Sequence, residues 1–339
     1  MADLWYALVA TLLTAYVVLD GFDLGAGALH RVVARTDEER RAVLGAIGPY
    51  WDGNEVFLLA AGGTLFAAFS RALAVALSGL YLAVFLLLWS LVLRGISIEF
   101  RSHLADGMWR AVWDTVLQVS SLALALLLGV ALGTVVRGYP FGADGWFTLE
   151  LFSTASPREA RGIVDGYTLS VGVFALAALT MHGGRFLAWK TEGAVAERSL
   201  RAAEVAQGAT AVVWVVVTGL SWLYAPAVTA GFAARPLAWG ALVVAAGSFA
   251  ATRVLGRRGR HRDAFVASAG FLAALLAMVA VAAWPVLVRD VGGARSLTVA
   301  TARNADASLA AGLRWWFFAA ALVAGYFVNL FRLHAGKKA

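Results

Sequence analysis

The chain has 339 residues, of which 61% are hydrophobic and 14% charged, and its mean hydropathy is +0.75. A composition this apolar excludes a soluble globular domain and indicates an integral membrane protein. The absence of cysteine excludes disulfides, thiolate metal sites and iron–sulfur clusters. The net charge of +7 comes from basic residues in short connections between apolar segments, which indicates membrane topology and not nucleic-acid binding.

Apolar segments of about 20 residues recur along the chain, which is the length of a membrane-spanning helix and about twice that of a barrel strand. The basic residues gather in alternate connections, so the positive-inside rule places the N-terminus outside and the C-terminus inside. The sequence therefore predicts an all-α polytopic membrane protein. We expect nine spans, at about residues 5–30, 46–69, 73–98, 112–136, 163–189, 205–225, 237–255, 264–288 and 313–333.

The outer connections alternate between short and long, which favours two four-helix bundles in tandem with one additional helix. This pattern predicts a first bundle at residues 1–136 and an outer loop at 137–162. A second bundle follows at 163–288, and residues 289–339 form another outer loop and a peripheral ninth helix.

Four acidic residues lie inside the first two spans. Asp20 and Asp23 are in "AYVVLDGFDLGAGAL", and Asp52 and Glu55 begin "WDGNEVFLLAAGGTLFAAF". Each acid near the bilayer centre costs about 2.5 to 3.5 kcal/mol, so such residues mark a functional site by default. At about 1.5 Å of rise per residue the two pairs reach overlapping depths, so we expect all four carboxylates to meet in the inner half of the membrane.

The third span ends in "LRGISIEFR", which adds three charged residues on the same side. We expect Arg101 to be a counter-ion of the carboxylates. Arg94 and Glu99 lie closer to the interface and are expected to extend their charged ends to the membrane surface. Two interpretations of the charged group stay open, because intramembrane ion pairs either conduct protons or ions or only fix helix packing.

The five histidines decide whether this chain is expected to hold haem, since haem iron commonly takes a histidine ligand. They are His30, His103, His182, His261 and His334. Only His182 lies well inside a span, where a packed histidine is the expected role, and no two of the five occupy facing mid-membrane positions. We therefore expect no haem and no metal on this chain, and the roles of His30 and His182 stay open.

Several motifs together resemble subunit II of the cytochrome bd family of quinol oxidases. They are "DGFDLGAGAL", "IGPYWDGNEVFLLAAGGTLFAAF", "LRGISIEFR" and "KTEGAVAERSLRAA", in that order, with a looser similarity in "ARSLTVATARNADASL". The resemblance implies a haem-free subunit that pairs with a larger subunit I in a bacterial cytoplasmic membrane, surrounded by lipid and in some complexes by small single-span subunits. The complex would be an electrogenic oxidoreductase that oxidises quinol and reduces O2 to water, with two b-type haems and one haem d in subunit I.

The resemblance also assigns roles to residues. The family's polar route towards the haems maps by motif onto Asp20, Asp23, Asp52 and Arg101, and Glu55 joins this group by its position. Trp51, Gly53 and Asn54 belong to the same motif and are expected to fix its geometry. The type of quinone stays open, as does the choice between conducting protons, guiding O2 and supporting subunit I.

Two other functions stay open from the residues alone. An ion-coupled secondary transporter would use the intramembrane carboxylates to bind H⁺ or Na⁺, although the chain lacks an obvious inverted repeat. A purely structural membrane subunit is the other alternative.

Overall fold

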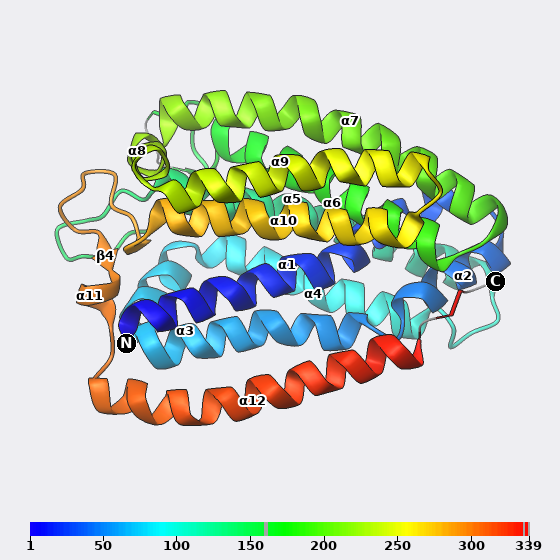
Figure 1. The fold of residues 1–339 in the computed structure, drawn as a ribbon, viewed down its shortest axis with the longest axis horizontal. Coiled ribbons are helices and arrows are strands. Elements are labelled where there is room, and N and C mark those ends of the chain that lie inside the picture. Colours follow the sequence, from blue (N-terminus) through cyan, green and yellow to red (C-terminus); the bar gives the residue numbers. More distant parts are fainter. Residues whose placement is uncertain (159–161, 335, 338–339) are drawn as a thin grey trace.

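The computed structural model describes residues 1–158, 162–334 and 336–337. Within these ranges, nine helices are long and apolar enough to cross a membrane, as the sequence predicts. They run side by side along the long axis of the molecule, with the two termini at opposite ends (Figure 1). These helices are α1 (Ala2–Val33), α3 (Trp51–Gly79), α4 (Tyr81–Phe100), α5 (Gly107–Arg137), α6 (Gly166–Lys190), α7 (Gly193–Tyr224), α9 (Pro236–Arg257), α10 (His261–Ala283) and α12 (Asp306–Leu333).

Helices that are near one another in the sequence pack together in each half of the chain. Helix α1 packs against α3 and α5, and α4 packs against α5; in the second half, α6 packs against α7 and α9 against α10. Helices α1 and α5 also lie directly against α6, so the two halves share an extensive interface. Helix α12 lies beside α3 at the edge of the molecule (Figure 1). The proposed domain boundaries stay a prediction.

Close contact between α1 and α6 depends on glycine. A Cβ at Gly25 of α1 would lie 2.0 Å from the carbonyl oxygen of Leu179 and 2.8 Å from the backbone nitrogen of Gly183, both on α6. No side chain fits at such distances, so glycine allows the two backbones to touch. Helix α1 is thereby placed in the middle of the molecule, with α3 and α5 on its other sides.

The ends of the helices carry short elements that the hydropathy pattern does not predict. Helix α2 (Asp37–Ile47) follows α1, and its N-terminus is closed by reciprocal hydrogen bonds between Thr36 and Glu39. At the opposite end lie α8 (Pro226–Ala234), α11 (Val299–Ala302) and two small sheets, which pair β1 (Glu150–Phe152) with β2 (Gly162–Val164) and β3 (Val286–Val288) with β4 (Leu297–Thr298). The prediction of helices alone was therefore incomplete at these ends.

The two long loops that were predicted to lie outside, around residues 137–162 and 289–312, contact each other. The backbone N–H of Tyr139 donates to the carbonyl of Arg289 at 2.8 Å, and the N–H of Val291 donates to the carbonyl of Tyr139 at 2.9 Å. Arg137, at the end of α5, forms a buried ion pair with Asp165, whose side chain also caps the N-terminus of α6. These bonds connect the loops into one surface; residues 159–161 of the predicted 137–162 loop lie outside the described ranges.

Candidate functional site

Helices α1, α3 and α4, all in the first half of the chain, bring an arginine and two carboxylates together. Arg94 of α4 contacts Asp20 of α1 with an Nη1–Oδ1 distance of 2.7 Å, and its Nη2 also pairs with Glu55 of α3. Arg94 is 1% exposed and Asp20 is fully buried, whereas the Glu55 side chain keeps 25% of its surface exposed. The expectation that Arg94 extends to the membrane surface is therefore wrong, because two carboxylates hold its guanidinium in the interior.

Asp23 lies one turn beyond Asp20 and has a neutral partner. The side-chain amide of Asn54 donates to Asp23 Oδ2 at 2.7 Å and to the carbonyl oxygen of Leu19 at 3.1 Å. Asp23 and Asn54 are both buried. We call Asp20, Asp23, Asn54, Glu55 and Arg94 the buried acidic cluster.

Asp52 does not enter this cluster, since its side chain is exposed at the start of α3. It lines a shallow groove of about 420 Å³ between α3 and α4, together with Glu55. The remaining lining residues are Trp51, Leu91, Val92, Gly95, Ile96, Glu99 and Phe100. Glu55 therefore belongs both to the buried acidic cluster and to an open surface that carries two further carboxylates.

The motif residues around the acids serve packing. The Trp51 ring lies over Gly95 of α4, where an added Cβ would approach the ring to 3.2 Å. Gly53 faces α12, where an added Cβ would lie in ordinary van der Waals contact with Tyr326 and Phe327, at 3.4 to 3.6 Å. These contacts support the expectation that Trp51, Gly53 and Asn54 fix the local geometry.

A second charged cluster lies at the end of the molecule that carries α2. Asp114 of α5 is fully buried and accepts from Arg101 Nε at 2.5 Å, while its Oδ1 lies 2.6 Å from His30 Nε2. Arg40 of α2 pairs with the other carboxylate oxygen at 3.0 Å. Arg101 also reaches Asp37 of α2 at 2.8 Å. We call His30, Asp37, Arg40, Arg101 and Asp114 the α2-end cluster.

The predicted role of Arg101 is thus corrected. Its partners are Asp114 and Asp37, whereas Arg94 serves Asp20 and Glu55. Sequence reasoning also missed Asp114 and left His30 open. One signal for Asp114 was available, because it is an acid within the predicted span 112–136.

Asp37 lies outside the membrane-spanning helices, and its ionisation is controlled by arginines. Partial burial opposes the charge, but hydrogen bonds from Arg101 and Arg41 hold the pKa of this carboxyl below its ordinary value. Arg110 adds a further contact at 3.0 Å. Asp37 therefore stays ionised and connects α2 to the ends of α4 and α5.

His30 and His182 are buried and each has a protein partner at Nε2, whereas Nδ1 of His30 has no hydrogen-bond partner among the residues that the structure describes. His182 Nδ1 lies 2.6 Å from the Ser268 hydroxyl, and its Nε2 lies 3.0 Å from the Val18 carbonyl oxygen. His30 Nε2 is bonded to Asp114. Within the described residues, no group of three or more His, Cys, Asp or Glu side chains has a metal-binding arrangement.

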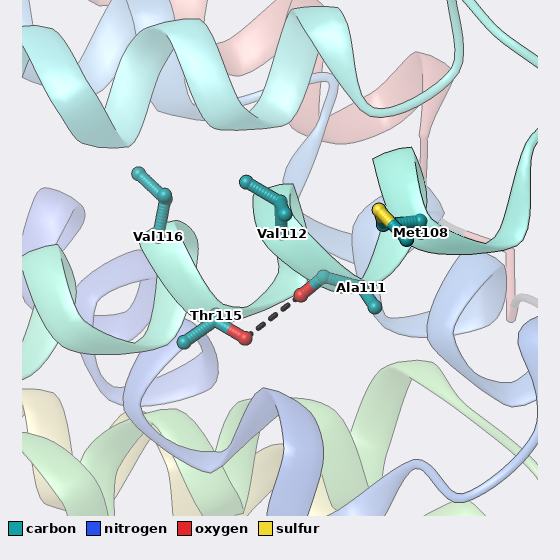
Figure 2. Close-up of a pocket in the computed structure, with 5 residues that line it drawn as sticks. All are labelled: Met108, Ala111, Val112, Thr115 and Val116. Atoms are coloured by element: carbon teal, nitrogen blue, oxygen red, sulfur yellow. Dashed lines mark hydrogen bonds between the residues drawn. The ribbon is translucent and has the colours of Figure 1, made fainter.

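A second shallow groove, of about 400 Å³, lies on α5 away from the buried acidic cluster (Figure 2). The Thr115 hydroxyl there donates to the carbonyl of Ala111 at 2.7 Å, so its proton is already used. The lining residues are Met108, Ala111, Val112, Thr115 and Val116, none of which is ionisable. This groove offers apolar contact and no proton chemistry.

The fold and the two clusters define a class of protein: a membrane protein that, in the residues described, has nine helices able to cross a membrane and keeps ion pairs among those of its first half. The sequence profile described as "Cytochrome bd terminal oxidase subunit II" matches residues 1–334. This chain belongs to that family, which agrees with the resemblance in its motifs.

Individual relatives agree with this assignment. The chain is 33% identical to cytochrome bd ubiquinol oxidase subunit 2 of Bacillus subtilis over 309 residues, covering 91% of this chain and 88% of that protein. It is 36% identical to cytochrome bd-I ubiquinol oxidase subunit 2 of Escherichia coli over 219 residues, which is 63% of this chain and 56% of the relative's length. A chain in the structure of bd oxidase from Geobacillus thermodenitrificans has the same fold, with a TM-score of 0.79, 18% identity and 98% coverage of both chains.

Proposed function

We propose that this chain is the second subunit of a quinol-oxidising, O2-reducing complex of a bacterial cytoplasmic membrane, and that it provides a route for protons. Family membership supports the oxidase subunit over a secondary transporter. Reduction of O2 to water consumes protons inside a dry protein, so ionisable groups and ordered waters must connect the reaction site with an aqueous surface.

One observation carries the proposed route. Arg94 joins fully buried Asp20 to partly exposed Glu55, and Glu55 opens onto the groove where Asp52 lies. The Arg94 cation stabilises one ionised carboxylate at a time. When a proton moves between Glu55 at the groove and Asp20 in the interior, the carboxylate that has lost its proton is still paired with Arg94. Asp23 and Asn54 extend the polar path along α1.

The α2-end cluster is suited to proton entry. His30 and Asp114 are buried within hydrogen-bond distance, and Asp37 places a carboxylate at the end of the helices. His30 and Asp23 are seven residues apart on α1, which corresponds to about 10 Å. Ordered water would have to bridge this interval. With the N-terminus outside, as the distribution of basic residues predicts, this end faces the cytoplasm.

We place the haems in the partner subunit, where they would supply the electrons and the iron that binds O2. Nε2 is the imidazole nitrogen that commonly binds haem iron, and in both buried histidines it already has a protein partner. His182 has both ring nitrogens within hydrogen-bond distance of protein oxygens, and Nε2 of His30 is held by Asp114. In this proposal, the side chains of this subunit bind protons and transfer them.

The groove between α3 and α4 is the surface that we assign to subunit I. Asp52 and Glu55 lie there on an otherwise apolar membrane-facing surface, with Glu99 at one end. An ionised carboxylate that faces lipid raises the free energy of the protein, so we expect a polar surface of another protein to cover Asp52 and Glu55. Large apolar side chains on the same helices, such as Phe85 at 48% and Trp89 at 53% exposure, would complete the contact.

The test is the Asp52→Asn variant of the intact complex, with Asp306→Asn as the control. Asp306 is an exposed acid at the start of α12 that pairs with Arg303, far along the chain from the route. We expect Asp52→Asn to retain the haem spectrum and the partner subunit but to lower O2 consumption by about tenfold or more. Normal turnover in this variant, with its haems in place, would contradict the route.

A further inference from the structure

Helix α1 is held from two sides at the level of its acids. The carbonyl oxygen of Val18 accepts a hydrogen bond from His182 Nε2 of α6 at 3.0 Å. The next carbonyl, that of Leu19, accepts from the Asn54 amide of α3 at 3.1 Å. Successive carbonyls of a helix point in directions about 100° apart, so these two bonds fix the rotation of α1 as well as its height.

The packing between α1 and α6 alone does not fix that rotation. Around Gly25 the two helices meet through backbone and small residues, which set the distance between the axes. Such a contact has no directional bond. His182, whose Cδ2 lies 3.9 Å from the position of a Cβ at Gly21, adds the directional bond at Val18, two residues before Asp20.

His182 is itself held in place. It is fully buried, its Nδ1 lies 2.6 Å from the Ser268 hydroxyl of α10, and its ring stacks on Phe265 with centroids 4.8 Å apart. The edge of the Phe22 ring lies against it from α1. With its ring plane set by α10 and α1, the Nε2–H has one direction, towards Val18.

We propose that His182 is a positioning residue for the proton route: by donating to the Val18 carbonyl it holds α1 in the rotation that brings Asp20 to Arg94 and Asp23 to Asn54. This inference rests on the proposed function for its effect on turnover. A rotation of α1 by about 20° moves a side-chain atom about 5 Å from the axis by about 2 Å. That shift breaks the 2.7 Å contacts of both acids.

Two substitutions at His182 separate its two hydrogen bonds. A glutamine amide reaches the place of Nε2, so His182→Gln keeps the donor for Val18. An asparagine amide reaches only the place of Nδ1, so His182→Asn keeps a partner for Ser268 and loses the donor for Val18. Ser268→Ala removes the other bond and is the matched control. All are made in the intact complex with its haems.

We expect His182→Gln and Ser268→Ala to consume O2 within about twofold of wild type, and His182→Asn to be slower by about tenfold with normal haem content. The effect acts through the buried acidic cluster, so it must be non-additive with Asn54→Leu: once Asn54 is replaced, His182→Asn adds less than about twofold. Full additivity of the two substitutions, or equal activity of His182→Asn and His182→Gln, would overturn the proposal.

Infrared difference spectra of the carboxyl groups separate this inference from the proton route itself. We expect His182→Asn to shift the bands that Asp20→Asn and Asp23→Asn remove, and His182→Gln to leave them in place. Shifted bands with unchanged turnover would keep the positioning role and overturn the proton route. Unshifted bands in His182→Asn would overturn the positioning role.

Discussion

Replacing Arg94 by methionine should destabilise the protein strongly. The guanidinium is 1% exposed and lies 2.7 Å from Asp20, which is fully buried. Removal of one partner from a buried ion pair leaves an uncompensated charge, which typically costs about 3 to 5 kcal/mol. Glu55 adds less to this loss, because its side chain is 25% exposed and can be solvated from the groove.

A double variant tests whether the loss arises from the unpaired charge. Asp20→Leu combined with Arg94→Met replaces the pair by apolar groups of similar volume, and such replacements are often neutral or stabilising. We expect the double variant to recover most of the stability lost by Arg94→Met. O2 consumption should stay low in both variants, because neither retains the ion pair that we assign to the proton route.

The measurement is thermal unfolding of the purified complex in detergent, together with haem content and O2 consumption. The reasoning about a buried charge is refuted if Arg94→Met alone is as stable as wild type, or if the double variant is no more stable than the single one. Full O2 consumption by a stable double variant would instead refute the functional role of Asp20 and favour a packing role.

Two further predictions concern the kink of α3 and a carboxylate of α2. Helix α3 is kinked at Phe69, with φ −141° and ψ 52°. Asn304 caps the kink with two hydrogen bonds of 2.8 Å: its backbone N–H donates to the carbonyl of Ala68, and its side-chain amide donates to the carbonyl of Ala67. We expect Asn304→Leu to lower the free energy of unfolding by about 2 kcal/mol. Thermal unfolding measures this loss against the control Asn329→Leu, which replaces an exposed asparagine. Equal stability of the two variants would contradict this role of Asn304. Because the pKa of Asp37 is lowered in the folded protein by Arg101 and Arg41, its contribution to stability is full above the ordinary carboxyl pKa and is lost as the pH falls through the folded value. The difference in unfolding temperature between wild type and Asp37→Asn should thus be present at neutral pH and vanish in acid, and a difference that is independent of pH would contradict it.

Hydropathy was sufficient to predict the nine helices that, in the described part of the chain, are long and apolar enough to cross a membrane, because the bilayer demands a long apolar segment for each crossing. The short elements at the helix ends were not predictable in the same way. Helix α2 forms in a polar connection through a local capping arrangement at Thr36 and Glu39, and strands β1 to β4 are only two or three residues long. Each strand pair forms within a single loop, where Glu150 pairs with Gly162 and Val286 with Thr298, and such short strands leave no repeating pattern in the sequence.

The identity of the arginine in the buried acidic cluster shows what the pattern leaves undecided. Arg94 and Arg101 are seven residues apart, which is close to two helical turns, so both project from the same side of α4. Their positions along the axis of α4 differ by about 10 Å. Which of the two arginines contacts Asp20 therefore depends on how α4 is shifted along its axis relative to α1. Asp52 was misplaced for a related reason: it lies three residues from Glu55, yet only Glu55 turns towards Arg94.

The exposure of the acids bears on the choice between the proposed proton route and a packing role. A charge pair that only fixes helices is most stable when both groups are paired and closed off from the membrane surface. Here Arg94 is shared between buried Asp20 and Glu55, and Glu55 reaches a groove that also carries exposed Asp52. Carboxylates on a membrane-facing surface weaken the isolated chain and add nothing to its internal packing. A polar partner surface over the groove would offset that cost, and the proposed proton route gives the carboxylates a use that packing within this chain does not.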